Sequence, residues 1–338
     1  MNTISVAAER TYNVTLDCSW EAQLPHQREL VFLVPESLRN IAGDSLKDFD
    51  LIFLPDGENQ KTITNYAGVL EELAKRNLGR DGVLVGLGGG ATTDLTGFVA
   101  ATYLRGIDWI AVPTTVAGMV DAAIGGKTGI NLQAGKNLAG AFHSPISVLI
   151  DYTWLKTLPQ RDINAGLAEA VKCGFIADPT ILELFQSNVE ANIKQIVSRA
   201  VSVKANVVSQ DFKESFHREI LNYGHTLGHA IEWDSGYELR HGEAISIGMV
   251  YAAALSAKYS NLPGDVVTLH QEILQSLELP ITYSSGAWSR LYEAMLVDKK
   301  ARNNQVRFVL LESIGSCRRG EGISEEELRK IYLEMIGE

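Results

Sequence analysis

The stretch VLVGLGGGATTD, residues 83–94, carries the strongest indication of fold in this chain. An apolar, β-branched run leads directly into glycines and then into a helix-like segment. Bare backbone that ends at a helix N-terminus is able to receive a pyrophosphate. Residues 86–91 also fit the form GxGxxA, although that fingerprint is weak by itself. The stretch therefore predicts a turn from a buried strand into a helix, with a bound dinucleotide as one interpretation and a merely tight turn as the other.

Glycine is concentrated around this stretch. Of the 30 glycines in the chain, 14 lie between Gly79 and Gly140. Glycine allows backbone to approach a ligand or another segment closely. We therefore expect this part of the chain to line a binding site.

The first half of the chain alternates short strand-like runs with amphipathic segments, which is typical of a parallel sheet flanked by helices. The spacing of apolar residues in 63–76 predicts a crossover helix. The predicted strands are residues 30–34, 51–54, 83–85, 109–112 and 148–150. We predict a doubly wound, Rossmann-like α/β domain over residues 1–157.

The second half is predicted to be mainly helical. Segments with helical periodicity cover residues 163–175, 179–209, 217–233, 243–260, 266–277 and 325–335, with one β-like stretch at 306–311. A chain of 338 residues that is 46% apolar is long enough for two cores. We predict a mainly α-helical domain over residues 158–338.

Charge and cysteine content limit the function classes. The net charge of -11 disfavours a diffuse basic surface for nucleic acid or anionic lipid, so we expect neither partner. Three widely spaced cysteines without CxxC spacing suit a reducing compartment. With no signal-like N-terminus and no apolar run near 20 residues, we expect a cytoplasmic protein.

Polar residues follow three of the predicted strands. The sequence DGENQK begins at Asp56, and Thr114 and Thr115 follow the strand at 109–112. Because open α/β sheets bind ligands at the carboxyl ends of their strands, we expect these residues to converge with residues 86–94. Further on, Lys127 and Lys136 stand among glycines and suggest a phosphate site.

Histidines and acids in the second half suggest a metal site. His225 and His229 are four residues apart and share one helical face. Two imidazoles and one carboxylate are the ligands of many catalytic zinc sites. Spacing alone does not decide between Glu169, His225 and His241 on one side and His225, His229 and Glu232 on the other. Further polar groups near these candidates are Lys172, Lys204, Glu214, Arg218 and Asn222. The lysines and the arginine among them suit a carboxylate or phosphate ligand.

Nine motifs, in order along residues 55–300, together resemble the 3-dehydroquinate synthase family. They are PDGExxK (55–61), GGGxxxDxxGFxAxxYxRG (88–106), PTT (113–115), DxxxGGKTGxN (121–131), GKN (135–137), AEAVK (168–172), LNYGHTLGHAIE (221–232), HGEA (241–244) and DKK (298–300). Several are long and chemically distinctive. The first 50 residues carry no motif that can be assigned.

The resemblance implies an NAD-dependent and metal-dependent lyase. It would convert 3-deoxy-D-arabino-heptulosonate 7-phosphate to 3-dehydroquinate and phosphate, with no net oxidation. The resemblance also implies that Glu169, His225 and His241 hold zinc or cobalt, while His229 faces the substrate. Within the glycine-rich window, it assigns residues 86–90 to the dinucleotide pyrophosphate.

The resemblance further assigns residues to the cofactor, the substrate and a partner subunit. Arg105 resembles a residue that reaches the neighbouring subunit's phosphate site, which implies a homodimer. The implied NAD contacts are Asp56, Gly57, Glu58, Lys61, Gly89, Gly90, Asp94, Thr114, Thr115, Lys127, Lys136 and Thr157. The implied substrate contacts are Asp121, Lys127, Asn137, Lys172, Lys204, Arg218, Asn222 and one of Lys299 or Lys300.

Two other enzymes use similar apparatus. One is a sugar-phosphate cyclase that acts on a related substrate. Arg218 and Lys204 could hold a substrate carboxylate, which favours the dehydroquinate activity over this alternative. The other is a polyol dehydrogenase. Lys127 and Lys136 argue against it, because they suggest a site for a phosphate group.

Overall fold

The computed structural model describes residues 2–41, 43–215, 217–299 and 306–338. The chain forms two compact units, one of Met1–Pro159 with Lys204–Lys213 and the other of Gln160–Val203 with Glu214–Glu338. The first division thus falls two residues after the predicted boundary. The segment Lys204–Lys213 falls within the predicted second domain, but it packs with the first unit. There Lys204 Nζ bonds Asp121, and Ser209 Oγ accepts the Ala7 N–H at 2.9 Å.

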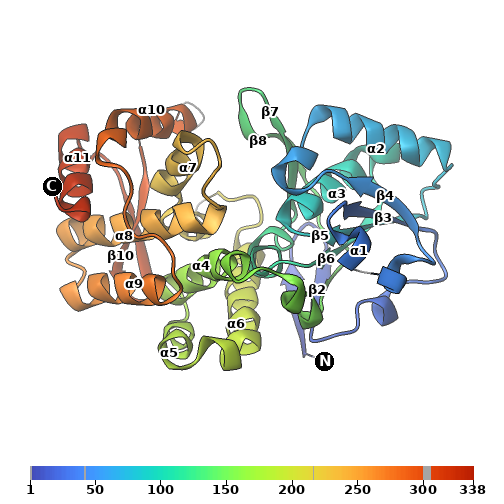
Figure 1. Ribbon diagram of the computed structural model, residues 1–338, viewed down its shortest axis with the longest axis horizontal. Coiled ribbons are helices and arrows are strands. Elements are labelled where there is room, and N and C mark those ends of the chain that lie inside the picture. Colours follow the sequence, from blue (N-terminus) through green and yellow to red (C-terminus); the bar gives the residue numbers. More distant parts are fainter. Residues whose placement is uncertain (1, 42, 216, 300–305) are drawn as a thin grey trace. The chain divides into compact units, whose positions relative to one another are not determined.

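The first unit is built on a seven-stranded sheet (Figure 1). Its order is β1-β2-β9-β6-β5-β3-β4, and every pairing is parallel except that of β1 with β2. The strands are β1 (Asn2–Ala7), β2 (Thr11–Leu16), β3 (Leu30–Pro35), β4 (Asp50–Leu54), β5 (Val83–Gly88), β6 (Asp108–Pro113) and β9 (Ser147–Ile150). All five predicted strands are present in this sheet.

The parallel core has the strand order 2-1-3-4-5, the other common order of doubly wound sheets. From β3 the chain adds β4 on one side and then β5, β6 and β9 on the other, so the strand order reverses between β3 and β5. In such sheets ligands bind outside the carboxyl ends of the strands at this point. The helices of this unit are α1 (Leu38–Ile41), α2 (Ile63–Lys75) and α3 (Gly90–Thr102). Its single turns are η1 (Glu21–Gln23), η2 (Gly43–Leu46), η3 (Gly57–Gln60), η4 (Tyr103–Arg105), η5 (Gly118–Ala122) and η6 (Tyr152–Thr157), of which η5 is π-helical.

Two hairpins of this unit were not predicted. The first, β1–β2, lies in the segment without assigned motifs. The second pairs β7 (Lys127–Leu132) with β8 (Gly135–Phe142) and packs on α3. Gly129 and Gly140 face each other across this hairpin, and a Cβ on Gly129 would lie 2.7 Å from the Ala139 carbonyl oxygen. These two glycines therefore serve strand pairing.

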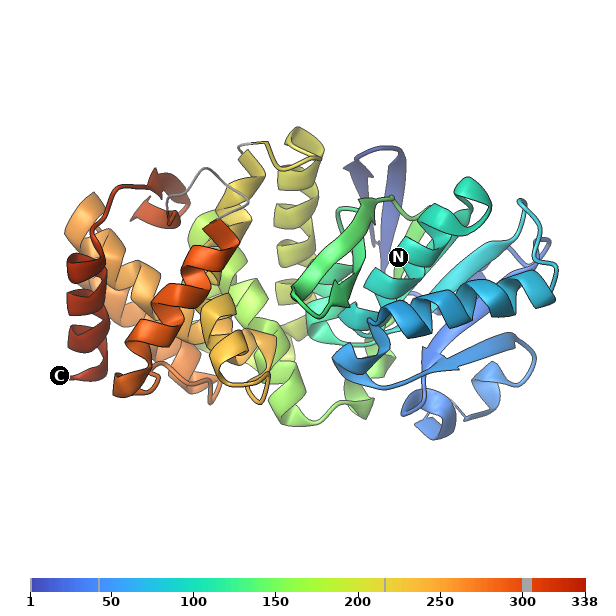
Figure 2. The same cartoon turned by 90° about the horizontal axis from the view of Figure 1, so that it is seen from above.

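The second unit is mainly helical, as expected (Figure 2). The predicted segment 179–209 is two helices, and the segment 217–233 is a 3-10 helix followed by an α-helix. The helices are α4 (Gln160–Ile176), α5 (Pro179–Ser187), α6 (Val189–Gln210), η7 (His217–Asn222), α7 (His225–Asp234), α8 (His241–Ser260), α9 (Gly264–Ser276), η8 (Ser285–Ala287), α10 (Trp288–Lys299) and α11 (Glu325–Ile336). The β-like stretch is the first strand of a hairpin, β10 (Phe308–Ser313) with β11 (Ser316–Gly320).

Helix α8 is the centre of this unit. It is buried on nearly all sides, and Tyr251 on it packs against the rings of Trp288, Phe308 and Tyr332. A helix that is apolar all round is a core helix in a large domain. Among the helices described, none combines the length and apolar content that crossing a membrane requires.

Candidate active site

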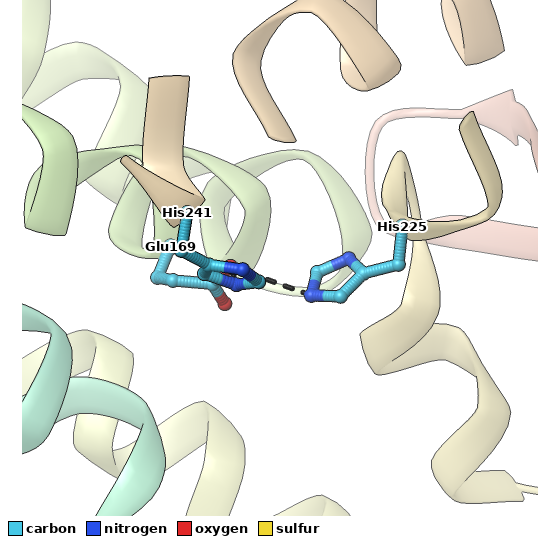
Figure 3. Close-up of side chains that lie close together, drawn as sticks. All are labelled: Glu169, His225 and His241. Carbon is cyan, nitrogen blue, oxygen red and sulfur yellow. Dashed lines mark ion pairs between the residues drawn. The ribbon is translucent and has the colours of Figure 1, made fainter. Parts of the chain in front are cut away.

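Three side chains from three helices of the second unit converge (Figure 3). Glu169 lies on α4, His225 begins α7 and His241 begins α8. The Nε2 atoms of the two imidazoles each lie 3.4 Å from Glu169 Oε1. All three ligand atoms lie within 4.8 Å of one another, which is close enough to share one metal ion.

A second group, His229, Glu232 and His241, satisfies the same distance limit. The two groups differ in what their carboxylates already bond. Oε2 of Glu232 lies 3.0 Å from His241 Nδ1, whereas Oε1 of Glu169 is buried and has no hydrogen-bond partner among the residues that the structure describes. A buried oxygen without a partner is costly unless a ligand satisfies it. The donor set of Glu169, His225 and His241 therefore fits a divalent metal better.

The outer nitrogens of both imidazoles are held by the protein. His225 Nδ1 lies 3.0 Å from the Tyr223 carbonyl oxygen, which only accepts, so Nδ1 donates. His241 Nδ1 faces the buried carboxylate of Glu232. Contacts of this kind set the tautomer and the ring orientation of a metal-binding histidine. In both rings they leave Nε2 for a ligand.

Charge is balanced tightly around Glu169. Lys172 Nζ donates to Glu169 Oε2, and both side chains are 2% exposed. Burial raises the pKa of Glu169, but Lys172, His225 and His241 outweigh it and hold that pKa well below its ordinary value. Burial and the Lys172 charge lower the pKa of His225 well below its ordinary value. The site thus favours an ionised Glu169 beside a neutral His225, the protonation states that bind metal. His241 differs, because Glu232 and Glu169 outweigh its burial and raise its pKa to about 10, so metal binding there must release a proton.

Glycines bring the three helices close together. A Cβ on Gly242 would overlap the carbonyl oxygen of Ala165, one turn before Glu169 on α4. At the crossing of α7 and α8, a Cβ on Gly248 would overlap the carbonyl oxygen of Gly224, and one on Gly228 would meet Ile245. The helices can therefore pack backbone against backbone at the residues that flank the ligands.

The other candidates of the second unit lie in different surroundings. Lys172 and Arg218 are buried, and Asn222 donates to Glu214 Oε1 at 2.8 Å. His229 is exposed, and its ring centroid lies 5.2 Å from that of His225. The side chain of Lys299 and the whole of Lys300 lie outside the described residues.

In the first unit, a polar network lies near the carboxyl ends of the strands. Lys61 is 2% exposed, and its Nζ lies 2.6 Å from Asp94 Oδ2 and 2.5 Å from Asn137 Oδ1. Asn131 donates to Glu58 Oε2 at 2.7 Å and accepts the Asn137 N–H at 3.0 Å. The network brings candidates from η3, α3 and the β7–β8 hairpin together. Asn131 received no role from the sequence, although it ends a conspicuous motif.

The strand-to-helix turn at residues 88–90 combines both interpretations of the sequence. A Cβ on Gly88 would overlap Thr92, and one on Gly86 would lie 2.7 Å from Thr96 Oγ1, so these glycines serve strand–helix packing. Gly89 is the N-cap of α3 and Gly90 its first residue, which leaves backbone N–H groups at the helix start. The glycines suited to a pyrophosphate are thus Gly89 and Gly90.

Other candidates of the first unit occupy nearby turns. Asp56 Oδ1 accepts the Ser37 N–H at 2.9 Å, and Thr115 Oγ1 accepts the Gly118 N–H at 3.1 Å. Thr157 Oγ1 donates to the Trp154 carbonyl. The remaining candidates differ in exposure, with Gly57, Lys127 and Arg105 exposed, Lys136 half-buried and Thr114 buried.

We expect Lys61→Met to lower the free energy of unfolding by about 1–3 kcal/mol, because a buried group loses a charged partner. Burial already raises the pKa of Asp94, and Lys61 opposes that rise. Urea denaturation followed by circular dichroism measures the change. The matched control is Lys75→Met, whose pair with Glu72 is exposed and is worth less than about 1 kcal/mol. Equal losses in both variants would contradict a structural role for the buried lysine.

Comparison with known proteins decides the family. The N-terminal domain model of 3-dehydroquinate synthase matches residues 51–165, and the C-terminal domain model matches residues 166–301. A 3-dehydroquinate synthase of Mycolicibacterium vanbaalenii is 47% identical over 327 residues, covering 95% of this chain and 91% of that protein. One of Corynebacterium diphtheriae is 43% identical and covers 98% of both chains. The chain belongs to the 3-dehydroquinate synthase family.

Solved structures of enzymes with other names have the same fold. A 2-epi-5-epi-valiolone synthase from Streptomyces hygroscopicus, with NAD+ and Zn2+ bound, has a TM-score of 0.89 at 23% identity and covers 98% of this chain and 99% of its own. A 2-deoxy-scyllo-inosose synthase with carbaglucose-6-phosphate, NAD+ and Co2+ has a TM-score of 0.84 at 24% identity and the same coverage. A probable glycerol dehydrogenase from Sinorhizobium meliloti is more distant, with a TM-score of 0.63 at 16% identity, covering 91% of this chain and 90% of its own.

Proposed function

We propose that this chain converts 3-deoxy-D-arabino-heptulosonate 7-phosphate to 3-dehydroquinate and inorganic phosphate. The observation that carries the proposal is the buried, unpartnered Oε1 of Glu169 faced by two imidazole nitrogens, in a chain of the 3-dehydroquinate synthase family. The reaction eliminates phosphate and closes a carbon ring without net oxidation.

Glu169, His225 and His241 hold one Zn2+ or Co2+ in this proposal. Two imidazoles and a carboxylate leave a coordination position for substrate, as in catalytic zinc sites. When bound, the metal acts as a Lewis acid on a substrate oxygen. Tyr223 and Glu232 keep the two rings oriented, and Lys172 keeps Glu169 ionised.

The carboxyl edge of the sheet in the first unit holds NAD in this proposal. The backbone N–H groups at the start of α3 suit the pyrophosphate, and the acids of η3 and its N-cap, Asp56 and Glu58, suit the ribose hydroxyls. When bound, NAD accepts a hydride from the substrate and returns it later. The remaining NAD contacts are Gly57, Lys61, Gly89, Gly90, Asp94, Thr114, Thr115, Lys127, Lys136 and Thr157.

Cationic and amide groups bind the anionic substrate in this proposal. Lysine suits phosphate as a point charge, and arginine suits a carboxylate as a planar donor. Although the chain has a net charge of -11, the proposed substrate site contains several lysines and an arginine. The assigned residues are Asp121, Lys127, Asn137, Lys172, Lys204, Arg218, Asn222, His229 and one of Lys299 or Lys300.

The test is phosphate release by the purified protein supplied with NAD and Zn2+ or Co2+. We expect release of inorganic phosphate from the heptulosonate phosphate, while NADH, followed by its absorbance, does not accumulate. A panel of related sugar phosphates, including glucose 6-phosphate, distinguishes this substrate from those of other cyclases. Steady NADH formation on a polyol without phosphate release would replace the proposal by a dehydrogenase.

We further propose a homodimer in which Arg105 serves the partner's site. Leu104, Arg105 and Gly106 all have positive φ, at 50°, 67° and 118°, an unfavourable backbone for the first two residues. Such strain is often retained where a side chain must be presented. Exposed apolar side chains for a contact between copies are Leu104, Leu132 and Leu138.

Co-expression of Arg105→Ala and His225→Ala subunits tests this arrangement. Each variant alone should be inactive, whereas the mixed dimer should regain one complete site. We expect restored phosphate release only in the mixture. An inactive mixture that sedimentation shows to be dimeric would contradict the shared site.

We place the enzyme in the cytoplasm. Cys18, Cys173 and Cys317 form no disulfide in the described part of the chain, and burial raises the pKa of the first to about 11 and of the last to about 12. Free, unreactive thiols suit a reducing compartment.

A further inference from the structure

Glu243 joins the start of α8 to the start of α4. Its side chain is 7% exposed, and its two oxygens accept from Arg161 Nε at 2.5 Å and Nη2 at 2.8 Å. Oε2 also accepts the backbone N–H of Arg240, the N-cap of α8, at 2.9 Å. A carboxylate at the third helical position that bonds the N-cap fixes the entry of the chain into a helix.

This junction lies where the metal ligands are placed. His241 is the first residue of α8, directly after the N-cap that Glu243 bonds. Gly242 then packs on the Ala165 carbonyl, four residues before Glu169 on the helix that also carries Arg161. A second pair, Arg240 Nε with Asp162 Oδ1, links the same two helix starts. The distance between His241 and Glu169 therefore depends on how this junction holds α8 against α4.

We propose that Glu243 is a positioning residue for the metal site. It contacts neither ligand through its side chain, but it sets His241 against Glu169 by clamping the first turn of α8 to α4. The proposal rests on the metal site proposed above. It adds that metal affinity depends on a carboxylate outside the ligand set.

The clamp is asymmetric in burial. Arg161 is 58% exposed, so water replaces much of what its guanidinium contributes. Glu243 is buried and also bonds the N-cap. Its loss leaves the Arg240 N–H and the Nε and Nη2 groups of Arg161 without their acceptor. We therefore expect removal of Glu243 to matter more than removal of Arg161.

The experiment measures Co2+ binding through the visible absorption of the bound ion, with the full-length protein. We expect Glu243→Ala to weaken Co2+ binding about 10- to 100-fold, the range for groups that orient metal ligands. Arg161→Ala should weaken it less. Glu243→Gln retains an acceptor for the Arg240 N–H and should bind with intermediate affinity, and it serves as the test if the alanine variant does not fold.

The matched control is Asp234→Ala. Asp234 is a buried carboxylate held by a similar two-pronged contact from Arg290, at 2.5 and 3.1 Å, in the same unit. We expect it to lower the melting temperature as Glu243→Ala does, but to bind Co2+ like the wild type.

Two results would overturn the inference in distinguishable ways. If Glu243→Ala and Arg161→Ala both bind Co2+ like the wild type, the role of Glu243 is structural only and the proposed function stands. If the wild-type protein itself fails to retain Co2+, the metal site of the proposed function falls, and the positioning role falls with it.

Discussion

His225→Ala should leave a folded protein that does not retain Zn2+ or Co2+, while His229→Ala retains the metal and loses turnover. In the first variant, Glu169 Oε1 keeps only one of its two facing imidazoles. Loss of a ligand should weaken binding by more than the roughly 100-fold that loss of a ligand-orienting group costs. His229 is exposed and lies outside the proposed ligand set, so its removal should leave the metal bound. Because His229 is a proposed substrate contact, its removal should slow phosphate release about 100-fold, the scale of a lost acid–base or substrate contact.

Metal content after dialysis, measured by plasma emission, separates the two variants. The near-ultraviolet circular dichroism of both should match the wild type, which excludes unfolding as the cause. Equal metal loss in both variants would contradict the assignment, because His229 lies outside the proposed ligand set. Metal loss in His229→Ala alone would favour the second group of possible ligands, which contains His229 and Glu232 but not His225.

Gly242→Ala should damage the same site without changing any ligand. The new Cβ would overlap the backbone carbonyl of Ala165, and a backbone atom of a helix does not swing aside. Helix α8 must then move away from α4, and His241 moves with it. We expect a loss of at least about 2 kcal/mol in the free energy of unfolding, typical of overpacking, together with more than about tenfold weaker metal binding.

Gly68→Ala is the matched control for this prediction. Gly68 is an exposed position within α2, and a Cβ there would meet nothing within 4 Å. Its replacement should stabilise the protein by about 0.5–1 kcal/mol, since alanine loses less backbone entropy in a helix. Chemical denaturation and a Co2+ titration measure both variants. Wild-type stability and metal affinity in Gly242→Ala would show that α4 and α8 do not need this close crossing.

Much of the first unit was predictable because its signals are local. A buried parallel strand is a short apolar run, and all five such runs are strands of the sheet. The polar residues after Leu54, Gly88 and Pro113 lie at the same edge because parallel strands end together. The hairpins were missed for the opposite reason. The β1–β2 pair is half exposed, and in β7–β8 the glycines that allow strand pairing resemble those of a phosphate loop.

In the second unit, spacing identified histidines and acids but left two possible ligand sets. Helical periodicity places a residue on a face of its own helix, and it does not say which faces meet. Tyr223 carried no signal at all, because it acts on His225 through a backbone carbonyl. Glu243 and Gly242 stand in the HGEA motif, yet their contacts with Arg161 and Ala165 lie about 80 residues away along the chain.

The sequence alone therefore determined the class of each unit, the family and the chemistry of the residue types. Tertiary structure alone decided which carboxylate is buried without a partner and which is bonded to an imidazole. It also decided that glycines in α7 and α8 allow α4, α7 and α8 to meet at backbone distance. The physical reason is that a metal site depends on distances of a few ångströms between side chains on separate helices. Those distances are set by tertiary packing, and the spacing of residues along the sequence does not predict them.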